Sequence, residues 1–164
     1  MVQPALSVEN ARPEDYDRIA ELTVGVYVDG RLASDGYTPQ LADVAGRAAR
    51  SELLVVRDAQ GHIVGSVALV LSGNFGEITT SDQEAAFRML VVDPAAQGQG
   101  AGKLLVSTCL DRARAAGKRR MVISTDPRMT TAHRLYERLG FTRLPERDWS
   151  PMPGIDLLAY ARDL

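Results

Sequence analysis

Residues 89–103 read MLVVDPAAQGQGAGK, the most informative stretch of the sequence. An apolar run ends at Pro94, and a glycine-rich turn then leads into residues with helical periodicity. Glycine permits positive φ angles and lets the backbone approach a ligand closely. The free N–H groups at a helix start, together with the helix dipole, attract anions. The stretch therefore predicts a strand, a turn and a helix that bind a phosphate or pyrophosphate.

Two common nucleotide-binding patterns do not fit this loop. A nucleotide-triphosphate loop needs glycine at the position of Gln97 and a hydroxyl residue at the position of Leu104. A dinucleotide fingerprint that begins at Gly98 needs glycine where Lys103 stands. A tight turn that uses glycine for geometry alone is a simpler alternative, but three glycines in five residues exceed what such a turn requires.

Hydrophobic periodicity on either side of the loop predicts alternating helices and strands. Helices are expected over residues 13–28, 40–50, 100–116 and 131–139. Strands are expected near residues 6–11 and over 53–57, 62–71, 87–92, 120–124, 141–144 and 155–160, with a polar loop over 72–83. Hairpins beside strand–helix–strand crossings predict a single α/β (α+β) domain over residues 1–164 with a mixed central sheet.

The composition is typical of one globular domain: 164 residues, 45% hydrophobic and 24% charged. Cys109 is the single cysteine, and His62 and His133 lack metal-ligand spacing, so we expect no disulfide and no metal. A net charge of -2 indicates no nucleic-acid partner. Neither a signal peptide nor a run of ~18 apolar residues is present, so we expect a cytoplasmic protein without membrane contact.

Three motifs resemble the GNAT superfamily of acyl-CoA N-acyltransferases. Gln97-x-x-Gly100-x-Gly102 resembles its pyrophosphate loop, and Leu90-x-Val92-x-Pro94 resembles the acyl-CoA-contacting strand that precedes it. Downstream, residues 132–141 (AHRLYERLGF) resemble the family's second hallmark, the helix after the cofactor cleft. The resemblance covers nearly the whole chain, and the two hallmarks stand in the family's order with a strand between them.

The resemblance implies a mostly antiparallel sheet, flanked by helices and splayed open where acetyl-CoA enters as the acyl donor. It implies that main-chain groups of Leu90, Val91 and Val92 hold the pantetheine arm. Main-chain N–H groups would bind the pyrophosphate, and these belong to Gln97, Gly98, Gln99, Gly100, Ala101, Gly102 and Lys103.

Two side chains are candidates for catalysis. By resemblance, Tyr136 is the residue that protonates the departing thiolate, although its spacing also fits an ordinary buried aromatic. Many family members carry a general-base glutamate where this chain has Ala86. Glu84 lies two residues earlier on the same strand face and is the candidate base, acting through a water. Its alternative is a solvated carboxylate at the end of the loop.

These residues together predict an N-acetyltransferase that transfers an acetyl group directly to a primary amine. A small-molecule acceptor is favoured over a peptide because the chain shows no second recognition module. Alternatives are a protein N-terminal or lysine acetyltransferase and a non-catalytic acyl-CoA-binding module, the latter supported by Ala86. Relatives of this kind often form homodimers. Trp149, Tyr37, Thr38 and residues 73–83 are candidates for acceptor contacts, while Cys109 is expected in the core and His133 at the surface.

Overall fold

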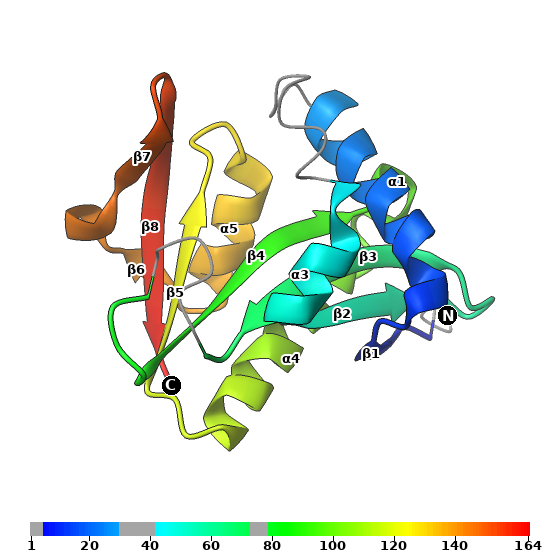
Figure 1. Cartoon of the computed structure of the whole chain (residues 1–164), viewed down its shortest axis with the longest axis horizontal. Coiled ribbons are helices and arrows are strands. Elements are labelled where there is room, and N and C mark those ends of the chain that lie inside the picture. Colours follow the sequence, from blue (N-terminus) through cyan, green and yellow to red (C-terminus); the bar gives the residue numbers. More distant parts are fainter. Residues whose placement is uncertain (1–4, 30–41, 73–78) are drawn as a thin grey trace.

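The computed structural model describes residues 5–29, 42–72 and 79–164 (Figure 1). The described helices are α1 (Tyr16–Asp29), α3 (Val44–Arg50), α4 (Ala101–Ala115) and α5 (Thr130–Arg138). The described strands are β1 (Ser7–Asn10), β2 (Glu52–Arg57), β3 (Ile63–Val70), β4 (Glu84–Val92), β5 (Arg120–Thr125), β6 (Thr142–Arg143), β7 (Trp149–Met152) and β8 (Ile155–Asp163).

The strands form one mixed sheet, as the sequence predicted. Its order is β1-β2-β3-β4-β5-β8-β6, with β7 paired to β8 beside this path. Neighbouring strands are antiparallel except for β4 and β5, which run parallel. β3 is buried at every position, because helices cover both of its faces, and this confirms the prediction drawn from its continuous apolar run.

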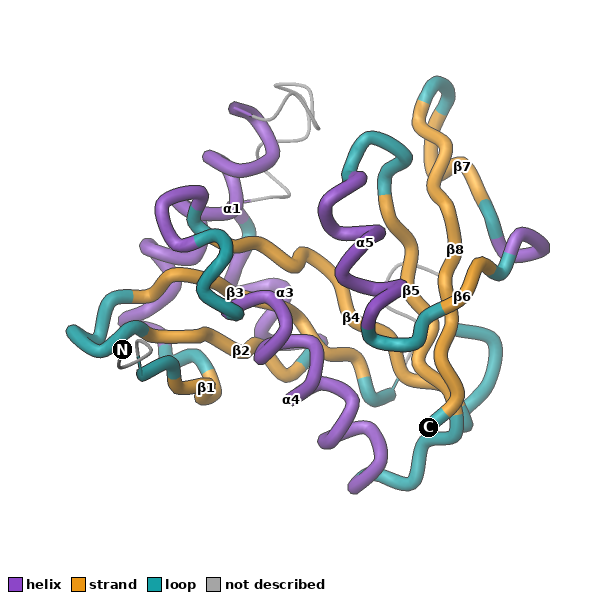
Figure 2. Tube along the Cα trace, turned by 180° about the vertical axis from the view of Figure 1, so that it is seen from behind, coloured by secondary structure: helices purple, strands orange, loops and turns teal. Residues whose placement is uncertain are grey.

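Helices lie on both faces of the sheet. α1 and α3 pack on one face with Ile19, Val44 and Ala68, as the front view in Figure 1 shows. α4 and α5 cover the opposite face, seen from behind in Figure 2, where Leu105 and Tyr136 join the largest hydrophobic cluster. Because side chains alternate along a strand, each β4 residue faces one pair of helices or the other.

The sheet divides between β4 and β5. Their parallel pairing extends from Glu84–Arg120 to Ala86–Val122. Beyond Ala86, β4 remains paired to β3, and β5 remains paired to β8, so the two strands separate (Figure 1). The glycine loop follows the end of β4, at the open end of this division.

Two predicted boundaries need correction, and a third falls partly outside the described residues. β4 begins at Glu84 and not at residue 87, because pairing with β5 extends the strand backward. Residues 149–152 form β7 and not a loop, since Trp149 pairs with Leu157 of β8 and an edge strand tolerates a proline. The second helix is described from Val44 onward, and residues 40 and 41 lie outside the described part of the chain.

Candidate active site

The glycine loop connects β4 to α4 through two residues in the left-handed region. Gly98 has φ +83° and Gly100, the N-cap of α4, has φ +88°. A Cβ atom at either position would meet nothing within 4 Å, so the loop borders open space. The first helical bond is donated by Leu104 N–H to the Gly100 carbonyl. Among the described residues, the N–H groups of residues 98–103 have no hydrogen-bond acceptor, so the loop fits an anionic group.

Gly102 has a different surrounding from the other two loop glycines. It lies in the first turn of α4, where an added Cβ would stand 3.3 Å from Leu135 Cδ2 and 3.6 Å from Val92 Cγ2. The missing side chain therefore lets α4, α5 and β4 pack closely together. The motif that predicted a phosphate loop gives no sign of this second role.

β4 has a bulge where it passes the division of the sheet. Its pairing with β3 changes register between Ser66 and Ala68, and Met89 takes φ +54°, a left-handed angle that is uncommon outside glycine. The main-chain groups of residues 87–92 that point toward β5 have no strand partner within the described chain. Such an unpaired edge can hydrogen-bond an extended ligand as an additional strand, and residues 90–92 belong to this edge.

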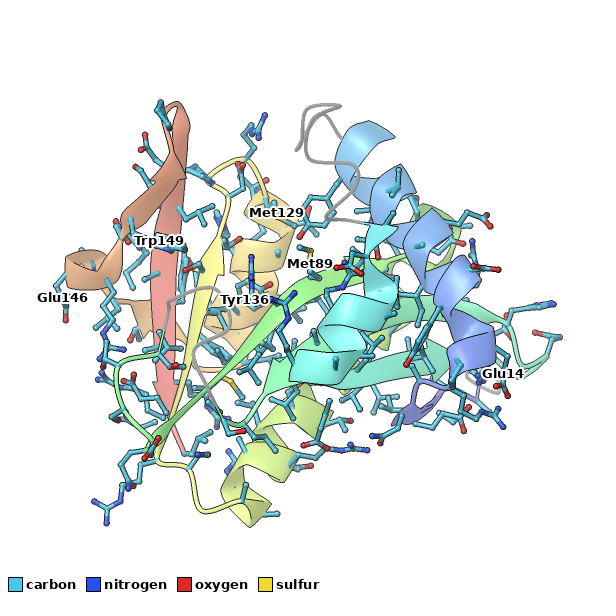
Figure 3. All side chains as sticks on the ribbon, viewed as in Figure 1. Glu14, Met89, Met129, Tyr136, Glu146 and Trp149 are labelled. Carbon is cyan, nitrogen blue, oxygen red and sulfur yellow. The ribbon has the colours of Figure 1, made fainter. Side chains whose placement is uncertain are left out.

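Tyr136 lies on α5 within a cluster of aromatic rings. Its ring centroid is 5.8 Å from that of Phe87, 5.7 Å from Phe141 and 6.2 Å from Tyr160. Burial raises the pKa of the Tyr136 phenol, so the group stays protonated at neutral pH. The hydroxyl has no hydrogen-bond partner among the residues that the structure describes. Figure 3 shows Tyr136 and Met89 in the central part of the molecule, where the sheet divides.

Glu84 lies on the other face of β4, at its first position. Arg147 Nη1 donates to its Oε1 over 2.7 Å, and the Thr80 N–H donates to the same oxygen over 2.9 Å. Burial alone would raise the pKa of Glu84, but these hydrogen bonds outweigh burial and lower it. Tyr136 packs against Phe87, which follows Glu84 by three residues, about 10 Å along the strand, and faces the opposite side of the sheet. The structure therefore does not bring Glu84 and Tyr136 together.

Two side chains near the open end of the sheet make contacts that sequence reasoning missed. His133 is half-buried, and its Nε2 lies 3.0 Å from the Asp126 carbonyl oxygen and 3.3 Å from Thr125 Oγ1. Trp149 donates its indole N–H to Ser124 Oγ over 3.0 Å, which joins β7 to β5. Both contacts depend on how β5 meets its neighbours, which spacing along the chain does not reveal.

The structure places Cys109 in the core and leaves several other predicted residues outside its described part. Cys109 is buried on α4, and burial raises the pKa of its thiol to about 12, so the prediction of a core residue is confirmed. Tyr37 and Thr38 lie outside the described residues, as do residues 73–78 of the predicted loop. Within residues 5–29, 42–72 and 79–164, no three His, Cys, Asp or Glu side chains are placed to hold a metal ion. No helix in this part of the chain is both long and apolar enough to cross a membrane.

Comparison with known proteins identifies the same family that the glycine-loop motif resembles. The family model for the acetyltransferase (GNAT) family matches residues 15–141. Aminoglycoside N(6')-acetyltransferase type 1 of Stenotrophomonas maltophilia is 25% identical over 93% of this chain and 97% of its own length. The L-methionine sulfoximine/L-methionine sulfone acetyltransferase of Salmonella typhimurium is 29% identical over 79% of this chain and 71% of its own. A match to mycothiol acetyltransferase of Streptosporangium roseum is 48% identical but covers 32% of this chain and 15% of that protein.

Solved structures share the fold over nearly the full chain. A GCN5-related N-acetyltransferase from Kribbella flavida has a TM-score of 0.74 and 26% identity over 98% of each chain. The structure of yncA from Salmonella typhimurium, solved with its cofactor acetyl-CoA, has a TM-score of 0.68 and 24% identity over 98% of this chain and 94% of its own.

Proposed function

The chain belongs to the acetyltransferase (GNAT) family, and on that premise we propose that it transfers an acetyl group from acetyl-CoA directly to the primary amine of a small molecule. One observation carries the proposal. The glycine loop presents N–H groups of residues 98–103 without acceptors in the described chain, directly after an edge of β4 that lacks a strand partner. Relatives that act on aminoglycosides and on methionine sulfoximine support a small amine as acceptor.

The reaction makes three demands on the chain. The amine nitrogen attacks the thioester carbon, so it must first lose its ammonium proton. The carbonyl oxygen then gains negative charge and requires a hydrogen-bond donor. The carbon–sulfur bond finally breaks, and the departing sulfur takes a proton. Acetyl-CoA supplies the acetyl group and the sulfur leaving group, and the protein supplies position, donors and protons.

In our proposal, main-chain groups bind the acetyl donor and supply the hydrogen bond to the carbonyl oxygen. The loop from Gln97 to Lys103 binds the pyrophosphate, and β4 from Leu90 to Val92 binds the pantetheine arm as an added strand. The bulge at Met89 breaks the regular pairing with β3. We assign the donor for the carbonyl oxygen to a main-chain N–H at this bulge, where the strand leaves its regular geometry.

Tyr136 is the proposed proton donor to the sulfur. Burial raises the pKa of its phenol, which keeps the group protonated at neutral pH. Glu84 is ionised, as a general base must be, but Arg147 and Thr80 already occupy its Oε1 oxygen. We therefore favour an amine that arrives neutral, or a base from another element, over proton removal by Glu84.

Thermal unfolding with and without acetyl-CoA tests the donor. A ligand at 100 times its dissociation constant stabilises the native state by about 2.7 kcal/mol, enough to raise Tm by several degrees. ATP and NAD at the same concentrations are the controls and should leave Tm unchanged. Equal Tm values with and without acetyl-CoA would contradict the assignment of the glycine loop.

Release of free CoA thiol in the presence of small amines tests the transfer itself. Tyr136→Phe should keep the acetyl-CoA shift in Tm and lower kcat by about 100-fold or more, because general acid catalysis contributes at least that factor. Tyr160→Phe is the matched control, since Tyr160 belongs to the same aromatic cluster. A Tm shift without thiol release for any amine would instead identify a non-catalytic acyl-CoA-binding module.

A further inference from the structure

The glycine loop is attached to the end of β4 through Asp93. The Asp93 N–H donates to the Val64 carbonyl of β3 over 2.8 Å. Its side-chain Oδ1 accepts from the Ala95 N–H over 3.0 Å, so Asp93 caps the short helix Pro94–Ala96. This helix ends directly before Gln97, so the cap sets the direction in which the chain enters the proposed pyrophosphate loop.

Arg18, in the first turn of α1, holds the other carboxylate oxygen of Asp93. Its Nη2 donates to Asp93 Oδ2 over 3.0 Å and to the Ile63 carbonyl of β3 over 3.3 Å. Its Nη1 donates to Glu21 Oε1 over 3.1 Å, nearly one turn further along α1. The guanidinium therefore joins α1, the start of β3 and the end of β4, and it keeps the Asp93 carboxylate in the orientation that caps the short helix.

The short helix Pro94–Ala96 is held on its other side by the hydrophobic core. Ala96 is buried and belongs to the same cluster as Leu105 of α4. α1 packs on the opposite face of the sheet, so the contact from Arg18 reaches the loop entry from the other side. Ala96 contributes one methyl group to the packing, whereas the charge-assisted hydrogen bond from Arg18 is directional. The ion pair therefore fixes the orientation of the loop entry.

We infer that Arg18 is a positioning residue for acetyl-CoA, because its ion pair with Asp93 holds the glycine loop in the conformation that binds the pyrophosphate. This inference rests on the proposed function of the loop. The N–H groups of residues 98–103 remain the proposed contacts to the ligand, and Arg18 acts on them through Asp93. When only one loop conformation binds, the apparent Kd rises as the fraction of molecules in that conformation falls. A helix on the face opposite α4 thereby contributes to binding of the acetyl donor.

The test is a titration with acetyl-CoA, which does not depend on the identity of the acceptor. Arg18→Gln removes the positive charge, and Asp93→Asn removes the negative charge but keeps an oxygen that can cap the short helix. We expect each variant to raise the Kd for acetyl-CoA about 3- to 10-fold, as for the loss of a charge-assisted hydrogen bond at a half-exposed site. The double variant should show the same rise as either single variant, because both substitutions break one contact.

Arg112→Gln is the matched control. Arg112 pairs with Glu52 over 2.9 Å, and their side chains are 31% and 37% exposed, against 36% and 29% for Arg18 and Asp93. Arg112 lies near the C-terminal end of α4, roughly 17 Å from the first residue of that helix at about 1.5 Å per residue. This variant should lower Tm about as much as Arg18→Gln does, and it should leave the Kd for acetyl-CoA unchanged.

Two results would overturn the inference. The first is a Kd for acetyl-CoA in Arg18→Gln and Asp93→Asn that equals the Kd in Arg112→Gln, since a lower Tm without weaker binding identifies an ion pair that only stabilises the fold. The second is a double variant in which the two losses of affinity add, because the residues would then act independently. Absence of acetyl-CoA binding by the unaltered protein would instead contradict the proposed function itself.

Discussion

Gly100 begins α4 with φ +88°, and Gly61 in the hairpin between β2 and β3 has φ +85°. An added Cβ would meet nothing within 4 Å at either position. The two glycines therefore share the same conformational strain, but one lies in the proposed pyrophosphate loop and the other does not. This pair separates the cost of the backbone conformation from the effect on binding.

We predict that Gly100→Ala and Gly61→Ala each destabilise the protein by about 1–2 kcal/mol, the cost of a left-handed alanine. Only Gly100→Ala should also weaken acetyl-CoA binding, because a loop that relaxes its strain moves the N–H groups of residues 98–103. Urea unfolding gives the stability, and titration with acetyl-CoA gives the affinity. Equal acetyl-CoA affinity in both variants would contradict the proposed role of the loop.

Single residues also mark the limit of what the sequence predicts. The loop glycines, Tyr136 and the buried Cys109 follow from motifs and helical spacing, since local chain geometry determines their places. The left-handed angle at Met89 does not follow, because it arises from a change of register against β3. Nor does the contact between Gly102 and Leu135, which depends on how two helices meet.

At the scale of elements, the ion pair between Glu84 and Arg147 ties the start of β4 to the short helix Pro145–Arg147. The exposed pair between Glu52 and Arg112 makes a similar contact at the start of β2, over 2.9 Å. The side chain of Glu84 is 7% exposed, whereas that of Glu52 is 37% exposed. Removing a buried carboxylate leaves its positively charged partner without a compensating charge, which destabilises the fold. At an exposed pair, water solvates the remaining charge, so the loss is small.

We predict that Glu84→Gln destabilises the protein by about 1–3 kcal/mol, since it removes a buried, charge-assisted hydrogen bond. Glu52→Gln should cost at most about 1 kcal/mol, as is usual for an exposed pair. Both variants should keep kcat within a few-fold once they are folded, and Tm and thiol release measure the two effects. A fall in kcat of about 100-fold or more in Glu84→Gln, at unchanged stability, would restore Glu84 as the general base.

Elements stabilised by local patterns were predicted well, and those stabilised by distant pairing were not. The continuous apolar run of β3 and the amphipathic α4 both appear where expected. The start of β4 at Glu84 and the whole of β7 were missed, because each depends on strands far away in the sequence. A polar residue at a strand start carries no hydrophobic signal of its own.

For the molecule as a whole, the two faces of the divided sheet are covered by different pairs of helices. α4 and α5 frame the side where the donor is proposed to bind, and α1 and α3 frame the opposite side. Direct transfer between two bound substrates requires that both reach one point, and we place that point where β4 and β5 cease to pair, beyond Ala86. The fold class was predictable from the order of helices and strands, whereas the separation of β4 from β5 was given by resemblance alone.

Buried ion pairs also set how the whole fold responds to acid. Burial would raise the pKa of Asp15 and of Glu84, but hydrogen bonds from Arg57 and Arg147 respectively outweigh it and lower both below their ordinary values of 3.8 and 4.5. A carboxyl with a lowered pKa in the folded state stabilises the fold above its unfolded pKa and loses that contribution as pH falls. We predict that Tm is nearly constant from pH 8 to about pH 5 and falls steeply below about pH 4.5, where the unfolded chain begins to take up these protons. Asp15→Asn should have a lower Tm at pH 7. Its Tm should also fall less steeply in acid, because the variant lacks the Asp15 carboxyl that takes up a proton on unfolding. If Tm falls as steeply below pH 4.5 in Asp15→Asn as in the unaltered protein, the proton uptake occurs at other carboxylates.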